Sequence, residues 1–457
     1  MTGASNLEIR AGGDEVSREY LQHSSAQRIN TDIVIVEALR KEYPELRLTV
    51  TPASNVDLFV YASAGHASVT PVDDSESWTW RVYAPPARRL DGGSGTLVVD
   101  VKFGKFLYKW QSHEFIVYLI HGRDGGASYP DIANFYILSA SNQAADDLIK
   151  AAGTYASQLH DQVWVFDQGF WQKSKELYNS FQKASWDDVI LDSNMKKELL
   201  ADVENFFDSR ETYDKLRVPW KRGTIYYGPP GNGKTISIKA MMRTLFNRKE
   251  RVSTLYVRTL SSFAGPEYSL SQIFTKARQE APCYLVFEDL DSIVDDRVRS
   301  YFLNEVDGLK KNDGIMMIGS TNHLDRLDPG ISKRPSRFDR KFYFADPNFD
   351  QRVKYCEFWQ HKLADNEDID YPDKLCVAIA KITDDFSFAY IQEAFVAALL
   401  SIAAAQKNHA SRKGNDLDDL VLWKEIQKQV KILREEMEEK HTIGSHVRLV
   451  HRHLGDS

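Results

Sequence analysis

Residues 228–235 read GPPGNGKT, directly after the apolar run TIYY at 224–227 and directly before the helical segment ISIKAMMRTLF at 236–246. An apolar strand, a glycine-rich loop and a helix in this order are the context in which such a loop binds phosphate. The glycines let the backbone turn tightly and direct its N–H groups at phosphate oxygens, and the positive end of the helix dipole adds to the attraction. The stretch therefore predicts a phosphate-binding loop between a buried strand and a helix.

The side chains of this loop indicate a nucleotide. The ammonium of Lys234 can reach β- and γ-phosphates, and the hydroxyl of Thr235 is the usual Mg²⁺ ligand in such loops. The predicted nucleotide-binding residues of the segment are Gly228, Pro229, Pro230, Gly231, Asn232, Gly233, Lys234, Thr235 and Ile236.

Two acids follow a second apolar strand. Residues 283–291 read CYLVFEDLD, which places Glu288 and Asp289 at the carboxyl edge of the predicted sheet, where ligands of α/β folds gather. In phosphoryl transfer one acid holds the hydrated Mg²⁺ and the other orients the attacking water. An isolated strand ending in two acids is usually a strand entering a turn, but after a phosphate loop the pair indicates nucleotide hydrolysis.

A third strand leads to polar and basic residues. Residues 315–340 read IMMIGSTNHLDRLDPGISKRPSRFDR and bring Asn322 to the same edge, followed by Arg337 and Arg340. An amide beside the γ-phosphate can position water, and an exposed arginine can stabilise the charge of the transferring group. Taken alone, SRFDR is also typical of an exposed basic turn.

The alternation of short apolar strands and helices beyond residue 185 indicates a parallel sheet covered on both faces. We predict an α/β fold of the P-loop NTPase type at 185–348, with a helical lid and tail at 349–457. Residues 1–160 predict a β-rich α+β domain, because strand-like runs separated by turn signals fill 46–138. Residues 161–184 are rich in aromatics and predict a connector that packs one domain on another.

Composition excludes several classes of protein. The chain has 457 residues, three cysteines and a formal net charge of −7, which argue against a disulfide scaffold and against a nucleic-acid footprint. No run approaches the roughly 18 apolar residues of a membrane helix, and no signal or transit peptide is visible. We expect a soluble intracellular protein, in the cytoplasm in the first place, with nucleus and mitochondrion left open.

Together these motifs resemble the AAA family of P-loop ATPases, and within it the Bcs-type subset, over residues 185–400. The resemblance rests on WDDVILD, YYGPPGNGKT, LVFEDLD, LNEVDGL, STNHLDRLDP and RPSRFDR in this order. It implies ATP and Mg²⁺ as cofactors and ATP hydrolysis as the activity. It also implies that Asn322 senses the γ-phosphate. Arg337 and Arg340 match arginine fingers that act on ATP of the neighbouring subunit, so the resemblance implies a ring of six or seven copies.

Three further segments are assigned through the resemblance. Asp188, Val189 and Ile190 match the segment that lies against adenine, and residues 387–389 (SFA) fall where the lid approaches the nucleotide. Most AAA proteins have Ser-Gly-Ala there, so Phe388 departs from the pattern. Phe263, Ala264 and Gly265 fall where AAA translocases carry a pore loop, although a buried loop aromatic fits the sequence nearly as well.

The acids are in reverse of the common family order, which is Asp and then Glu. The inverted order is similar to that of Bcs-type proteins. We expect Glu288 to hold Mg²⁺ and Asp289 to orient water.

The leading hypothesis is an ATP-driven, chaperone-like ring that remodels, translocates or disassembles a protein client recognised by residues 1–160. The alternative is a nucleotide-gated interaction scaffold with slow or no turnover. A DNA-loading AAA protein is weaker, because the chain is acidic and has no clustered Lys/Arg run.

Overall fold

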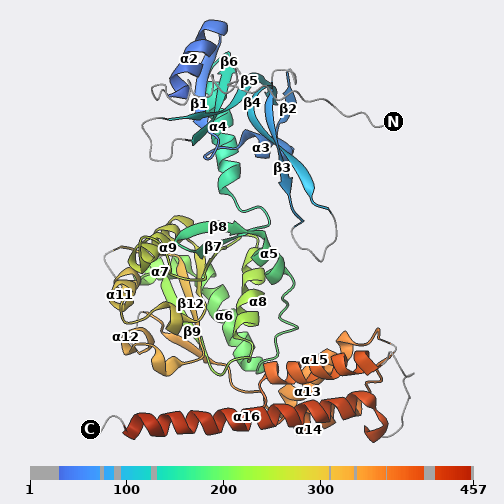
Figure 1. Cartoon of the computed structure of the whole chain (residues 1–457). Helices are drawn as coiled ribbons and strands as arrows, with labels where there is room; N and C mark the ends of the chain where they lie inside the picture. Colours follow the sequence, from blue (N-terminus) through green and yellow to red (C-terminus); the bar gives the residue numbers. More distant parts are fainter. Residues whose placement is uncertain are drawn as a thin grey trace, which may run out of the picture. The chain divides into compact units, whose positions relative to one another are not determined.

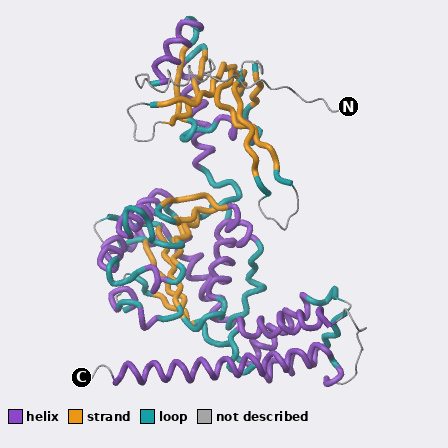
Figure 2. The backbone as a smooth tube through the Cα atoms, viewed as in Figure 1, coloured by secondary structure: helices purple, strands orange, loops and turns teal. Residues whose placement is uncertain are grey.

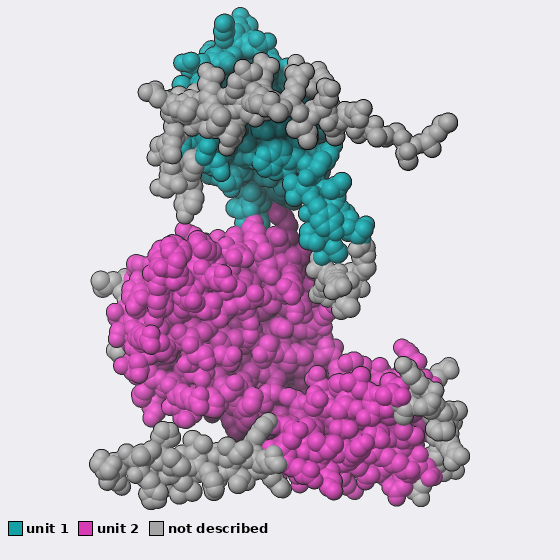
Figure 3. Space-filling model, viewed as in Figure 1, with its two compact units in different colours: residues 1–159 teal, residues 160–457 magenta. Residues whose placement is uncertain are grey.

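The computed structural model describes residues 30–72, 77–86, 94–124, 131–307, 310–333, 337–366, 368–405 and 417–453. The chain divides into two compact units, Met1–Leu159 and His160–Ser457 (Figure 3). Each unit has its own hydrophobic core, so each is described by itself.

The first unit is built on an antiparallel sheet. Its described elements are α2 (Thr31–Glu42), β1 (Arg47–Pro52), α3 (Leu58–Ser63), β2 (Ser68–Pro71), β3 (Trp78–Ala84), β4 (Thr96–Trp110), β5 (His113–Arg123), β6 (Asp131–Ser139) and α4 (Asn142–Ser157). The strand order is β1-β6-β5-β4-β2, and β3 pairs with the N-terminal half of β4, from Thr96 to Phe103.

Alternation along the strands of this unit produces two apolar faces. On β5, Val117 and Leu119 face a core shared with α3 and α4, whereas Ile120 belongs to a smaller cluster on the side of α2. Successive strand side chains point to opposite faces, which explains the division. The predicted β-rich α+β character of the N-terminal region is thereby confirmed.

The second unit is built on a seven-stranded sheet in the order β13-β9-β12-β11-β10-β7-β8. Figure 2 draws its strands in orange, and Figure 1 labels β7, β8, β9 and β12. Its strands are β7 (Val163–Asp167), β8 (Phe170–Ser174), β9 (Lys221–Tyr227), β10 (Ser253–Val257), β11 (Cys283–Phe287), β12 (Ile315–Thr321) and β13 (Arg340–Tyr343). All neighbours are parallel except the β7–β8 pair.

Helices cover both faces of this sheet (Figure 1). They are α5 (Lys175–Gln182), α6 (Ser193–Asp208), α7 (Arg210–Leu216), α8 (Lys234–Phe246), α9 (Pro266–Glu280), α10 (Leu290–Ile293), α11 (Arg299–Asp307) and α12 (Pro329–Ser332). On β11, Leu285 and Phe287 face the core under α9 and α11, whereas Tyr284 and Val286 face the core under α6 and α8. A parallel strand covered on both sides reads as a continuous apolar run, as predicted.

Residues 161–184 differ from the prediction of a connector. They form β7, β8 and α5, and β7 pairs in parallel with β10 as an inner strand of the sheet. Of the aromatics, Phe166 and Phe181 are buried in the two cores of this unit, whereas Phe170 is exposed. The aromatic residues therefore indicated packing, but the segment packs within the sheet of its own unit and does not join two domains. Its strand β7 pairs with β10, which lies far along the chain.

A helical region ends the chain. It consists of α13 (Phe349–Lys362), α14 (Asp373–Ile382), α15 (Phe388–Ala405) and α16 (Val421–His453). The short 3₁₀ turn η3 (Leu417–Asp419) precedes α16, and another, η2 (Leu324–Arg326), lies earlier in the unit, between β12 and α12. Asn348 and Gln351 form a reciprocal capping box at the start of α13, which fixes where this region leaves the sheet. The predicted fold class, an α/β sheet with a helical lid, is confirmed.

Candidate nucleotide site

The glycine-rich loop connects the end of β9 to the start of α8, and its conformation requires glycine. Gly228 has φ +139°, and a Cβ there would lie 2.3 Å from the Phe344 carbonyl oxygen. Gly231 has φ +82°, and a Cβ there would lie 2.4 Å from the Ala389 Cβ. No other residue fits either position without movement of the backbone or of the lid.

Lys234 lies folded back inside this loop. Its Nζ donates hydrogen bonds to the carbonyl oxygens of Gly228 (2.7 Å) and Pro229 (2.8 Å). Burial lowers the pKa of Lys234, while the nearby carboxylates of Asp289 and Asp346 act in the opposite direction. Among the described residues, the hydrogen bonds of the Lys234 ammonium go to carbonyl oxygens, and an ionised partner such as a phosphate would form a stronger, charge-assisted hydrogen bond.

Asn232 fastens the loop to its surroundings. Its amide nitrogen donates to Asp346 Oδ1 at 2.8 Å, and its amide oxygen accepts from the Phe388 backbone N–H at 3.4 Å. The Ala389 N–H donates to the Gly231 carbonyl at 3.2 Å. The segment at 387–389 therefore contacts the glycine-rich loop through its backbone N–H groups. The phenyl group of Phe388, which stands where most AAA proteins have glycine, does not prevent this contact.

A pocket of about 420 Å³ brings the separate motifs together. Its lining comprises Asp188, Val189, Ile190, Pro230, Gly231, Gly233, Lys234, Thr235, Ile236, Glu288, Asp289, Ser320, Asn322, Tyr355, Phe388, Ala389 and Gln392. The volume lies in the range of small-molecule sites. Three further lining residues were not predicted: Ser320 belongs to the STNHLDRLDP segment but carries no predicted role, and Tyr355 and Gln392 lie outside every motif, so only the fold brings them to the pocket.

The two acids are held by different strands. The Glu288 carboxylate accepts a hydrogen bond from the hydroxyl of Tyr256 on β10. Asp289 adopts φ +51° at the start of α10, and its backbone N–H donates to Ser320 Oγ on β12 at 3.2 Å. The two acids are therefore contacted from different neighbouring strands, and Asp289 is close enough to influence the ammonium of Lys234.

The residues fit a hydrated Mg²⁺. Glu288 Oε1 is buried and makes no hydrogen bond within the described part of the chain, and the Thr235 hydroxyl lines the same pocket. Carboxylate and hydroxyl oxygens are the hard ligands that Mg²⁺ prefers, and an otherwise unpaired buried oxygen is costly.

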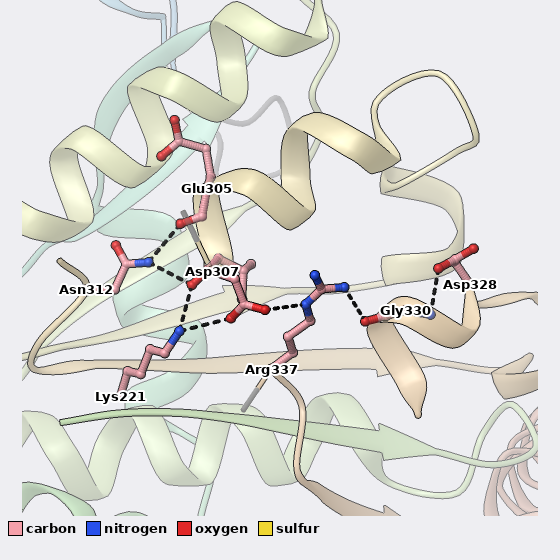
Figure 4. Close-up of polar contacts among 8 residues, drawn as sticks. Lys221, Glu305, Asp307, Asn312, Asp328, Gly330 and Arg337 are labelled. Carbon is pink, nitrogen blue, oxygen red and sulfur yellow. Dashed lines mark hydrogen bonds and ion pairs between the residues drawn. The ribbon is translucent and has the colours of Figure 1, made fainter. Parts of the chain in front are cut away.

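Arg337 and Arg340 do not line this pocket. Arg337 is 6% exposed, and its guanidinium donates to Asp307 Oδ2 and to the Gly330 carbonyl, both at 2.5 Å (Figure 4). Lys221 Nζ donates to Asp307 Oδ1 at 3.0 Å from the other side. The Arg340 side chain is 57% exposed and lies 3.5 Å from Asp202 Oδ1.

The loop at 263–265 presents its aromatic residue to solvent. Phe263 is 82% exposed, so the alternative of a buried loop aromatic is wrong. Its ring stacks on that of Phe170 on β8, with centroids 5.9 Å apart. Gly169 lies against the same loop, where a Cβ would be 2.6 Å from Ser262 Cβ. Ala264 and Gly265 follow Phe263 and lead into α9.

Comparison with known proteins agrees with this geometry. Residues 224–346 match the family model described as ATPase family associated with various cellular activities (AAA). Residues 224–346 therefore resemble an AAA domain, and the parallel sheet covered by helices is consistent with the P-loop NTPase fold. A relative is the ATPase family gene 2 protein of Schizosaccharomyces pombe, 29% identical over 225 residues, which are 47% of this chain and 27% of that protein. The chain thus matches about a quarter of the relative's length.

Within the described ranges, the structure contains no helix that is both long and apolar enough to cross a membrane.

Proposed function

We propose that the chain is a Mg²⁺-dependent ATPase that hydrolyses ATP and uses the turnover to remodel a protein client. The observation that carries this is the single pocket in which the phosphate loop, both acids, Asn322 and the lid meet. These segments are far apart in the sequence, and each supplies a different requirement of phosphoryl transfer.

Each side chain has a role that its position supports. Lys234 exchanges its two carbonyl partners for phosphate oxygens, and Thr235 with Glu288 holds the metal, which neutralises phosphate charge when bound. Asp289 orients the attacking water, and Asn322 positions it at the γ-phosphate. Residues 188–190 and Tyr355 line the pocket and form the proposed binding surface for the base.

The assembly state is part of the proposal. We infer a ring of six or seven copies in which Arg340 reaches the ATP of a neighbouring subunit. Its exposure supports this role, because a finger must leave its own subunit. Arg337 acts in the same way only after release from Asp307.

The client-handling role is supported by two surfaces. Phe263, Ala264 and Gly265 form a pore-loop candidate with an exposed aromatic, and residues 1–160 form the proposed recognition module. A Bcs-type affiliation is supported by the order of Glu288 and Asp289. We propose 185–348 as the ATPase core and 349–457 as lid and tail.

Two substitutions test the proposed ATPase. Lys234→Ala should abolish nucleotide binding, measured with a fluorescent ATP analogue, because the phosphate loses its only buried cation within the described pocket lining. Asp289→Asn should retain ATP binding and lose steady-state hydrolysis. Wild-type turnover in either variant would contradict the assignment.

The same assays examine the alternative of a nucleotide-gated scaffold. A scaffold binds ATP and changes its assembly state without sustained release of phosphate. Steady-state phosphate release by the wild-type chain, absent from Asp289→Asn, supports the enzyme and excludes the scaffold.

A further inference from the structure

Tyr256 reaches the candidate nucleotide site from a neighbouring strand. In the parallel pairing of β10 with β11, Tyr256 is opposite Val286, two residues before Glu288. Side chains two residues apart on a strand share a face. Glu288 directly follows the end of β11, and the hydroxyl of Tyr256 donates a hydrogen bond to its Oε2.

The surroundings of Tyr256 hold this donor in place. Its ring packs at the margin of the core beneath α8, next to buried residues of β7 and β11.

The hydrogen bond gives the two oxygens of the Glu288 carboxylate different surroundings. Oε2 is occupied by Tyr256, whereas Oε1 is buried and has no hydrogen-bond partner among the described residues. Glutamate has one more rotatable bond than aspartate, and an unrestrained carboxylate would lose that freedom on binding a metal. Because the hydrogen bond from Tyr256 fixes Oε2, the carboxylate has one orientation, and Oε1 is the oxygen that remains to bind a metal or its water ligands.

The second acid has a separate support. Asp289 is anchored through its backbone to Ser320 on β12, on the opposite side of β11 from Tyr256. It also acts on Lys234, whereas Glu288 is engaged by β10. Each acid is therefore contacted by a different one of the two strands that flank β11: Glu288 by β10 and Asp289 by β12.

We propose that Tyr256 is a positioning residue of the ATPase site, whose hydroxyl fixes Glu288 so that Oε1 faces the Mg²⁺ hydration shell while Asp289 is left to the attacking water. This inference rests on the proposed ATPase function. Tyr256 is not among the residues that line the nucleotide pocket, so its proposed route to that pocket is the hydrogen bond to Glu288. In this proposal the first acid of the inverted pair, Glu288, is the one that Tyr256 holds, and the second, Asp289, is the one that orients water.

The test measures metal affinity apart from turnover. Tyr256→Phe removes only the hydroxyl and retains the packed ring. With full-length protein loaded with ADP, Mn²⁺ binding followed by electron paramagnetic resonance should weaken about tenfold, the usual cost of losing a partner behind a metal ligand. The Mg²⁺ concentration for half-maximal ATPase should rise in parallel, while binding of a fluorescent ADP analogue in EDTA stays unchanged.

Two further variants keep the inference falsifiable. Tyr371→Phe is the matched control, because it removes a hydroxyl that donates to the Cys356 carbonyl at 3.0 Å in the helical region, and it should leave Mn²⁺ binding unchanged. In a Glu288→Ala background, Tyr256→Phe should have no additional effect. An unaltered Mn²⁺ affinity in Tyr256→Phe, or an equal loss in the Glu288→Ala background, would overturn the inference.

The outcomes separate this inference from the proposed function. Absence of ATP turnover in the wild type contradicts the enzyme, while the Mn²⁺ comparison still decides the role of Tyr256. Normal wild-type turnover with normal Mn²⁺ binding in Tyr256→Phe contradicts the positioning role alone.

Discussion

Arg337 and Arg340 are close in the chain but have different surroundings. Arg337 is buried between Asp307 and the Gly330 carbonyl, whereas the side chain of Arg340 is more than half exposed. Loss of Arg337 leaves the partly buried carboxylate of Asp307 with Lys221 as its one ion-pair partner among the described residues, so it should destabilise the fold by about 3 kcal/mol. Loss of Arg340 should cost under about 1 kcal/mol. Arg340 is therefore the cleaner position at which to test a finger.

Asp307 makes the stability of this region depend on pH. Burial alone would raise the pKa of Asp307, but hydrogen bonds from Arg337 and Lys221 bring it below its ordinary value. Because the folded-state pKa is the lower one, the stabilisation is fully present above the unfolded-state value of about 3.9 and is lost as pH falls through the folded-state pKa. Asp307→Asn should lower the free energy of unfolding by about 1–3 kcal/mol at pH 7.

The measurement for Asp307 is urea unfolding over a pH series. The difference between wild type and Asp307→Asn should shrink as the pH falls below 4, because the wild-type carboxyl then becomes neutral as well. Asp296→Asn, at a side chain that is 92% exposed, is the control and should differ little from wild type at any pH. A pH-independent difference for Asp307→Asn would contradict the electrostatic explanation.

At the scale of elements, the phosphate loop and the lid helix α15 contact each other at Gly231. Gly231→Ala adds a methyl group where the Ala389 Cβ already lies 2.4 Å away, and it should push the lid from the loop. We expect ATP affinity to fall at least about tenfold, since about 1.4 kcal/mol of lost contact corresponds to that factor. Isothermal titration with a non-hydrolysable ATP analogue measures this.

Gly65→Ala is the matched control for this substitution. Gly65 has a similar φ of +87°, but nothing lies within 4 Å of an added Cβ. It should show the backbone strain, about 1 kcal/mol of stability, without loss of ATP affinity. Equal effects of the two variants on ATP affinity would show that the lid contact is irrelevant.

The β7–β8 hairpin and the loop after β10 form one exposed aromatic pair, Phe170 and Phe263. Neither ring is buried, so Phe170→Ala and Phe263→Ala should each change stability by no more than about 0.5 kcal/mol. We expect basal ATPase to stay intact and binding of an unfolded model protein to fall in both. Leu216→Ala, 67% exposed on α7, is the control. Unchanged client binding in both phenylalanine variants would count against a shared surface.

At the scale of the whole molecule, fingers that act between subunits predict complementation. Arg340→Ala subunits keep an intact pocket but offer no finger from this position, whereas Lys234→Ala subunits offer the finger but bind no nucleotide. Each variant alone should be inactive, and a mixture should regain phosphate release at concentrations where the ring forms. Absence of recovery in mixed assemblies, verified by light scattering, would contradict action between subunits.

Local sequence carried much of this protein's architecture. The phosphate loop and the strands β9, β11 and β12 were predictable, because glycine positions and apolar periodicity express demands of a few consecutive residues. The place of β7 in the sheet was not, since its partner β10 begins about ninety residues later in the chain.

The sequence by itself determined that the chain has an α/β sheet with a glycine-rich loop, two acids and a polar residue at its carboxyl edge. Only the tertiary structure decided that Tyr256 holds Glu288, that Arg337 is enclosed by Asp307 and Gly330, and that Phe170 stacks on Phe263. Backbone conformation and burial leave a pattern in neighbouring residues. Contacts between side chains on different strands and loops depend instead on how those elements pack, and no local pattern encodes them.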